Sequence, residues 1–385
     1  MSPVVVPISA PVLDWALEET NVSNSALAED LGVPTSLIDG WRQGKAQPTT
    51  SQFHKLARAL RRPESFFFLP RPPVDADLPA AFRSALAATK AEISPDDAAT
   101  VRAARRVQRI SEWLGQKGYR TASSVPASSY PQDAPELAAQ RLGDWLESDS
   151  TWERGATANA FAQSVRASLE ERGVLVLHSP LDNRGWRGFA LQSPTAALIT
   201  ANSHYGPRPR IFTYLHELAH LSTRTESLCP VAGRAGLERW CDEVAGAMLM
   251  PAAEVRTAVA LSLNGGRATT IHHVRSIANR FNSSLRAGAV RLESLDLARP
   301  GLYEEVNSEA NVREIRQRGG GSGNPQTAAR SRLQRFGAGY LGPLLRAESG
   351  GALSRTDVQE LLDLSANQLR ELQVLAARTY QFVDE

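Results

Sequence analysis

The sequence predicts an α+β fold that is mostly α-helical, with one small sheet near the middle of the chain. Short helices are predicted towards both ends of the 385 residues. Short apolar, β-rich runs cluster between residues 174 and 201. A proline-rich segment (70–79) and a glycine-rich segment (318–325) separate the helical stretches. We therefore expect an N-terminal helix-turn-helix bundle (1–70), a helical linker region (71–150), a core that carries the sheet (151–300), and a flexible linker with a small helical C-terminal domain (301–385).

The N-terminal segment contains four predicted helices. The first covers Leu13–Glu19, and the second covers Ser25–Leu31 and is ended by Gly32. The third, Thr35–Arg42, begins after a proline, and the fourth covers Gln52–Leu60. Short helices joined by a glycine-containing turn are the helix-turn-helix pattern, and this series resembles a Cro/repressor-type domain.

That resemblance implies DNA binding through the third helix. On this docking geometry the base edges would face Thr35, Ser36 and Asp39, and the phosphates would face Arg42 and Lys45. Residues 42–71 hold seven Lys or Arg against one acid, but the first forty residues are acidic, so the domain is nearly neutral. A protein-recognition module built on the same helices is therefore the alternative.

The middle of the chain is predicted to form a sheet against a helix. Three apolar runs, Val174–Leu177, Gly188–Leu191 and Ala196–Ala201, are typical of short strands. The helix that follows them begins near two prolines and continues to Leu221. A sheet edge beside this helix would offer main-chain hydrogen bonds to an extended peptide.

The most informative motif is His216-Glu217-Leu-Ala-His220. Residues four apart share one face of a helix, so both imidazoles can bind one metal ion. Glu217 leaves that face by about a quarter turn, which places a carboxylate near a metal-bound water without making it a ligand. We expect one Zn²⁺ per chain.

A third protein ligand is expected from the next helix, which runs from Leu237 to the proline at 251. Glu238 and Asp242 are four apart and share a face, so one can bind the metal while the other orients a ligand histidine. We assign Glu238 as the ligand and Asp242 as the residue that holds the histidine. Glu243 lies about 100° away on the helical wheel and is the alternative ligand.

These residues resemble the ImmA/IrrE family of zinc metallopeptidases. The resemblance rests on Phe-Thr-x-x-His-Glu-Leu-x-His and on Glu-x-x-Cys-Asp-x-Val-Ala followed by Leu-Met-Pro, and it covers residues 188–251, more loosely to 292. Family members usually carry Ala, Asn and Phe where this chain has Cys241, Asp242 and Val244. An Asp accepts the same hydrogen bond as an Asn.

The resemblance implies a zincin-like metallopeptidase core that acts on a regulatory protein, typically a transcriptional repressor. By the family pattern His216, His220 and Glu238 bind the metal and Glu217 is the general base. The oxyanion of the reaction needs a further donor, for which His204, Tyr205, Arg208 and Tyr214 are candidates, although each is expected to be structural or exposed.

The C-terminal segment is predicted to form helices over residues 326–345, 354–362 and 366–380, with Ser354 as an N-cap. Such a tail would bind a partner, pack on the core, or contact DNA through Arg330, Arg332 and Arg335. An alternative function follows from chains with similar tails: a DNA-binding autoregulator or antitoxin, beside a toxin, whose metal site is not used for proteolysis.

Composition sets the remaining expectations. A net charge of +2 indicates no particular partner, and two cysteines, Cys229 and Cys241, do not make a disulfide framework. The absence of a signal peptide or an apolar run of 18 residues predicts a cytoplasmic protein with no membrane contact. The expected partners are a repressor or toxin and DNA, and the oligomeric state stays open, a dimer included.

Overall fold

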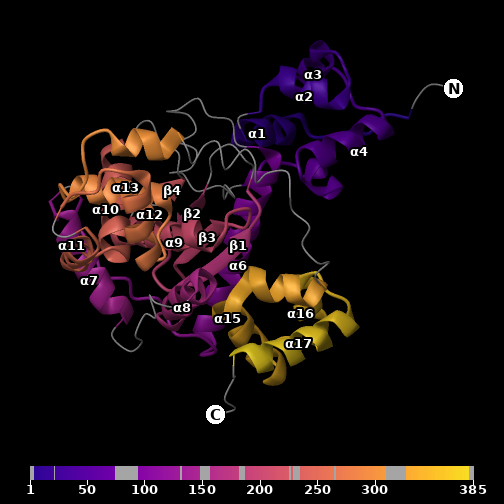
Figure 1. Cartoon of the computed structure of the whole chain (residues 1–385). Helices are drawn as coiled ribbons and strands as arrows, with labels where there is room; N and C mark the ends of the chain where they lie inside the picture. Colours follow the sequence, from indigo (N-terminus) through magenta and orange to yellow (C-terminus); the bar gives the residue numbers. More distant parts are fainter. Residues whose placement is uncertain are drawn as a thin grey trace. The chain divides into compact units, whose positions relative to one another are not determined.

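The computed structural model describes residues 4–20, 22–73, 94–130, 132–147, 157–181, 187–224, 227–228, 235–263, 266–308 and 327–380. The chain divides into two compact units (Figure 1). The first is built mainly on residues 1–106, and the second on residues 107–179, 187–229 and 234–385. In the part of the chain described, no single helix is long and apolar enough to cross a membrane, although one pair of helices bent by 60° meets the criteria of length and composition.

The N-terminal unit contains α1 (Ala10–Thr20), α2 (Asn24–Leu31), α3 (Thr35–Arg42), α4 (Thr50–Ala59) and the 3-10 helix η1 (Glu64–Phe68). The Ser23 side chain caps α2, and Gly32 ends it with a left-handed φ of 66°. A capping box between Thr49 and Gln52 begins α4. Apolar side chains from all five helices form one core, at whose centre Trp41 is fully buried. The predicted helices are therefore present, with bounds shifted by a few residues.

The N-terminal unit extends beyond residue 70, where the sequence predicts a domain boundary. Helix α6 (Pro95–Gln116) contributes its first half to this unit. Glu19 on α1 is buried and pairs with Arg62, and Arg102 of α6 lies 3.4 Å from the same carboxylate. Arg102 also donates to the backbone oxygen of Arg61 at 3.1 Å. One buried carboxylate of α1 thus contacts guanidinium groups from the segment after α4 and from α6, which links α6 to the first bundle.

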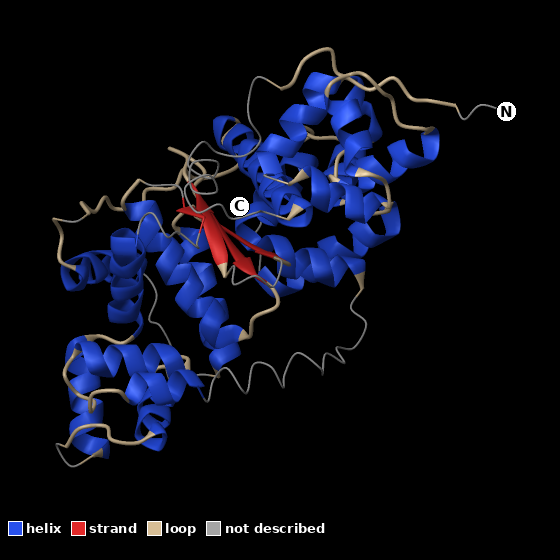
Figure 2. Cartoon of the chain, turned by 90° about the horizontal axis from the view of Figure 1, so that it is seen from above, coloured by secondary structure: helices blue, strands red, loops and turns tan. Residues whose placement is uncertain are grey.

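The second unit surrounds a small four-stranded sheet with helices (Figure 2). Its strands are β1 (Leu175–Ser179), β2 (Gly188–Leu191), β3 (Leu198–Asn202) and β4 (Ser227–Leu228), in the order β1-β3-β2-β4. β1 and β3 are parallel, whereas β2 runs antiparallel to both of its neighbours. The three longer strands lie where the sequence predicts them, and they are almost entirely buried.

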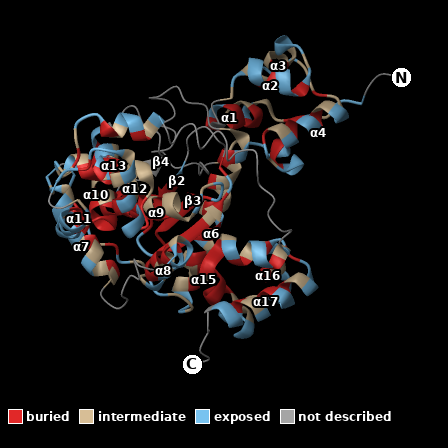
Figure 3. Cartoon of the chain, viewed as in Figure 1, coloured by how far each residue is buried: buried red, intermediate tan, exposed pale blue. Residues whose placement is uncertain are grey.

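The helices of this unit are α7 (Pro135–Glu147), α8 (Ala158–Glu171), α9 (Pro207–Ser222), α10 (Ala235–Leu249), α11 (Ala252–Ser262), α12 (Ile271–Arg280) and α13 (Leu285–Ser294). α9 packs against β2 and β3 on one side and against α8 and α10 on others. Every residue of α9 from 213 to 222 is buried, as the red ribbon of Figure 3 shows for the centre of the unit. A helix enclosed on all sides holds its polar side chains in fixed positions.

The C-terminal helices belong to the same unit as the sheet. α15 (Ala328–Ser349) packs on β1 and α8, and α16 (Arg355–Leu362) and α17 (Ala366–Tyr380) pack on α15. Ser354 caps α16 as predicted, in a capping box with Asp357. The tail thus packs on the core, which is one of the three roles that the sequence leaves open. The predicted glycine-rich linker at 318–325 lies outside the described residues.

Candidate metal centre

Helix α9 brings the two histidines of the motif to one face. Its first residue is Pro207, which suits the first helical turn because the nitrogen of that residue has no partner inside the helix. His216 and His220 follow at a spacing of one turn, and their ring centroids lie 4.9 Å apart. Their Nε2 atoms are separated by 3.2 Å. Both side chains are buried, so neither ring is free to turn away into solvent.

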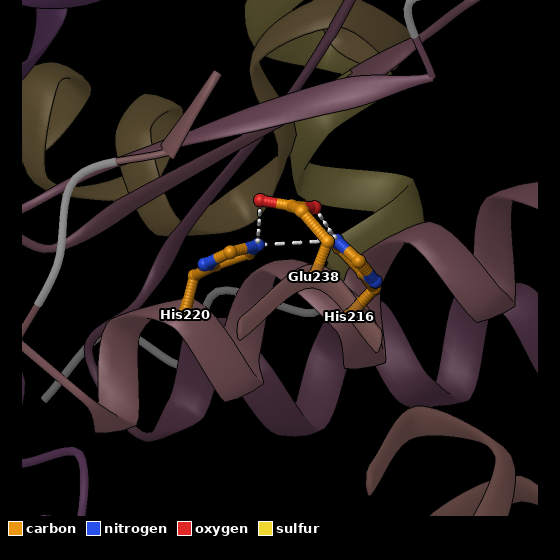
Figure 4. A group of neighbouring side chains, drawn as sticks. All are labelled: His216, His220 and Glu238. Atoms are coloured by element: carbon orange, nitrogen blue, oxygen red, sulfur yellow. Dashed lines mark hydrogen bonds and ion pairs between the residues drawn. The ribbon is translucent and has the colours of Figure 1, made fainter. Parts of the chain in front are cut away.

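Glu238 on α10 completes a group of three side chains (Figure 4). One carboxylate oxygen lies 3.4 Å from the His216 Nε2 atom, and the other lies 3.3 Å from the His220 Nε2 atom. The Glu238 side chain is 18% exposed, so the group is closed to bulk water on most sides. Two imidazoles and one carboxylate therefore converge on one point from two helices.

The separations between these atoms fit a tetrahedral metal ion. At bond lengths of 2.0–2.1 Å, two ligands of a tetrahedral ion lie about 3.3 Å apart. The two Nε2 atoms lie 3.2 Å apart, close to this value, and each lies 3.3 or 3.4 Å from a different oxygen of Glu238. With one ligand atom taken from each residue, all three atoms lie within 4.8 Å of one another. A tetrahedral ion bound by three protein ligands keeps its fourth position for water or substrate, which is the arrangement of catalytic zinc sites.

Asp242 lies one turn after Glu238 and contacts the other side of the first histidine. Its Oδ1 atom is 2.9 Å from the His216 Nδ1 atom. A carboxylate there fixes the proton on Nδ1 and leaves Nε2 as the metal-binding nitrogen. Glu243, the alternative ligand, instead pairs with Arg239 at 3.0 Å on the surface of α10. The geometry thus favours Glu238 over Glu243 as the third ligand.

Glu217 lies beside the sheet. The residue is 1% exposed, and a Cβ atom added to Gly188, the first residue of β2, would lie 3.5 Å from the Glu217 Oε1 atom. The carboxylate therefore lies where the start of β2 meets the histidine helix. A carboxylate on the residue that follows a ligand histidine would supply a proton acceptor for a water on a bound metal ion.

Two of the four candidates for the oxyanion donor form hydrogen bonds with other residues of the protein. The Tyr214 hydroxyl is hydrogen-bonded to His178 on β1, on a different face of α9 from His216. Arg208 donates to Asn279 of α12 at 2.7 Å. The expectation that these residues are structural agrees with their contacts. His204 and Tyr205 precede α9, and His204 is exposed.

The candidate DNA-contacting residues lie on or next to α3 in the N-terminal unit. Thr35, Ser36 and Lys45 are exposed. Arg42, however, pairs with Asp14 of α1 and donates to the side-chain oxygen of Asn24 at 2.9 Å. The Asp39 carboxylate accepts a hydrogen bond from the side-chain nitrogen of Asn24 at 2.5 Å. These contacts join α1, α2 and α3, so Arg42 and Asp39 have structural partners that the sequence analysis missed.

Cys241 on α10 is buried and forms no disulfide with a described residue. Cys229 lies outside the described residues. The tail arginine Arg332 donates to the Leu362 carbonyl at 2.6 Å and pairs with Asp363 at 2.9 Å, so it fastens α16 to α15.

Comparison with known proteins assigns part of this unit. Residues 169–293 match the family model of the IrrE N-terminal-like domain, a peptidase family. The matched segment begins in α8 and ends in α13, so it contains the two histidines, Glu217, Glu238 and the three longer strands. It supports the resemblance to the ImmA/IrrE family and points to a metallopeptidase. No curated protein matches the chain.

Proposed function

We propose that the protein is a zinc-dependent endopeptidase that cleaves a regulatory protein, such as a transcriptional repressor. The observation that carries the proposal is the convergence of two imidazoles and one carboxylate, with the Nε2 atoms 3.2 Å apart and a different Glu238 oxygen within 3.4 Å of each. The neighbouring Glu217 carboxylate supports a catalytic role for the ion, since a purely structural site needs no acid beside its water position.

Each residue has a separate task in this reaction. His216, His220 and Glu238 would hold the zinc ion, which when bound polarises the scissile carbonyl and acidifies a water. Glu217 accepts the proton of the attacking water and passes it to the leaving amine. Asp242 keeps the His216 ring oriented, and β2 begins beside Glu217.

A Glu217→Gln variant separates the enzyme from the alternative function. The amide has the shape of the carboxylate but cannot take a proton, so the variant should keep its metal and stop cleaving its substrate. The first substrate to test is the protein encoded by the neighbouring gene. Co-expression with that neighbour, followed by mass spectrometry of the neighbour, is the measurement, and Glu243→Gln is the matched control. If Glu217→Gln regulates as well as the wild type and the neighbour stays intact in both, the protein is a binding regulator or antitoxin and not a peptidase.

We also propose that the N-terminal unit binds DNA. Support comes from the tight turn at Gly32 between α2 and α3, and from the exposure of Thr35 and Ser36 at the start of α3. Gel shift with the upstream region of its own operon tests this role. Lys45→Ala should weaken binding and reduce its salt dependence by about one phosphate contact. Absence of any shift at low salt would contradict the proposal.

A further inference from the structure

The second unit contains a large cavity apart from the metal ligands. It is bounded by α8, β1, α9 and α15 and has a volume of about 910 Å³. That volume is sufficient for a small-molecule ligand. None of His216, Glu217, His220 and Glu238 lines it. Residues of α15, which packs on β1 and α8, form part of its lining.

The lining of the cavity is rich in positive charge. Four guanidinium groups line it, from Arg120, Arg166, Arg210 and Arg346. Of the two lining acids, Glu170 accepts from Arg166 at 2.8 Å and from the backbone N–H of Gly339 at 3.0 Å, so its charge is already matched. Among the described lining residues, the other acid is Glu171, beside the three remaining arginines. A partly enclosed space with an excess of positive charge attracts anions.

The positive charges that line the cavity are partly removed from water, which strengthens their interaction with an anion. Desolvation lowers the pKa of Arg120 to about 10, although the acid Glu112 opposes the shift. Burial, together with the charges of Arg166 and Arg210, lowers the pKa of His178 to about 2, so its imidazole is neutral. The histidine therefore adds no charge, and the arginines define the potential inside the cavity.

Helix α9 presents hydrogen-bond donors to this cavity. The Nη1 atom of Arg210 lies 3.4 Å from the His178 Nδ1 atom. A guanidinium can only donate, so Nδ1 is the acceptor and the imidazole proton resides on Nε2. That proton is directed at the Tyr214 oxygen, which leaves the tyrosine O–H available to donate. Among the described residues, the buried Nε of Arg210 has no hydrogen-bond partner.

We propose that this cavity is a binding site for a small molecule that carries a phosphate or carboxylate group, held by Arg210 and Tyr214 of α9 and by Arg346 of α15. A planar guanidinium suits the two oxygens of such a group. The same helix carries the metal-ligand histidines six and ten residues after Arg210, so a ligand here contacts the element that positions the metal centre. The proposal does not depend on peptidase activity.

Calorimetric titration of the full-length, metal-loaded protein tests the site. Inorganic phosphate and succinate are the two probes, each titrated at constant ionic strength, and the stronger of them identifies the preferred group. Arg210→Gln should weaken binding about tenfold to a hundredfold, because a charge-assisted hydrogen bond to a partly buried anion is lost. Arg208→Gln is the matched control, since this arginine lies on the same helix but bonds to Asn279 and does not line the cavity.

Two further variants make the result decisive. His216→Ala removes a metal ligand, so binding that persists in it cannot occur at the metal. Arg210→Lys keeps the positive charge but loses the planar guanidinium group, so it should bind the probe several-fold more weakly than the wild type. This variant replaces Arg210→Gln if Arg210→Gln does not fold. The proposal is overturned if neither probe binds, if binding disappears in His216→Ala, or if the Arg210 variants bind no more weakly than Arg208→Gln.

Discussion

Replacing Asp242 with alanine should weaken metal binding without disturbing the fold. The side chain lies 2.9 Å from the His216 Nδ1 atom and is 56% exposed. Removing a carboxylate that orients a ligand histidine costs about 10- to 100-fold in metal affinity. Because solvent screens the half-exposed Asp242, we expect about tenfold, which corresponds to about 1.4 kcal/mol. Asp242→Asn keeps a hydrogen-bond acceptor and should lose less.

Competition with a chromophoric chelator measures the affinity of each variant for Zn²⁺. Glu243→Ala is the control, because it removes the next carboxylate on α10, one that pairs with Arg239 instead of a histidine. The order of affinity should be wild type and Glu243→Ala together, then Asp242→Asn, then Asp242→Ala. Equal affinities for Asp242→Ala and Glu243→Ala would refute the role given to Asp242.

Three other perturbations follow from the packing around the site and the cavity. Gly188→Ala places a Cβ atom 2.5 Å from the backbone oxygen of Thr200 and 3.5 Å from the Glu217 carboxylate, so it should lower the free energy of unfolding by about 1–3 kcal/mol. Gly143→Ala is the control, because its Cβ atom would meet open space and should leave the stability unchanged. Equal melting temperatures of the two variants would contradict this prediction. At Gly337 the backbone has a φ of 67°, and an added Cβ atom would collide with the Arg166–Glu170 pair. Gly337→Ala should therefore lower the melting temperature more than Gly351→Ala, where φ is 75° and the added Cβ atom meets open space. Similar decreases in melting temperature would show that the collision is relieved. The pKa of His178 is lowered to about 2 in the folded protein, so below the ordinary value of 6.5 the unfolded chain binds a proton that the folded chain does not, and stability present above pH 6.5 is lost as the pH falls. Between pH 6.5 and pH 5.5 the free energy of unfolding of the wild type should fall by about 1 kcal/mol more than that of His178→Gln in urea titrations. Equal losses in the two proteins would contradict this prediction.

The local spacing of residues predicted the centre of the site. His216 and His220 share a face because one helical turn separates them, and the same period pairs Glu238 with Asp242. Apolar, β-rich runs likewise predicted the three longer strands. These predictions need only a residue and its neighbours on one element.

The features that the sequence did not predict depend on contacts between distant segments. Arg42 bonds to Asp14, 28 residues away, and the first half of α6 joins the N-terminal unit through Glu19. The cavity forms because α15 packs on β1 and α8. The sequence likewise gives no sign that the Tyr214 hydroxyl is hydrogen-bonded to His178 on β1 and is therefore not an oxyanion donor. No periodicity within one helix reports such partners.

The zinc content of the purified full-length protein tests the central claim most directly. After loading with Zn²⁺ and dialysis, inductively coupled plasma mass spectrometry should find one zinc per wild-type chain and per Glu217→Gln chain. His216→Ala and Glu238→Ala should each lose most of it, because each variant removes one of the three protein ligands. A wild-type protein without zinc, or a Glu238→Ala variant that retains a full equivalent, would contradict the assignment of this site.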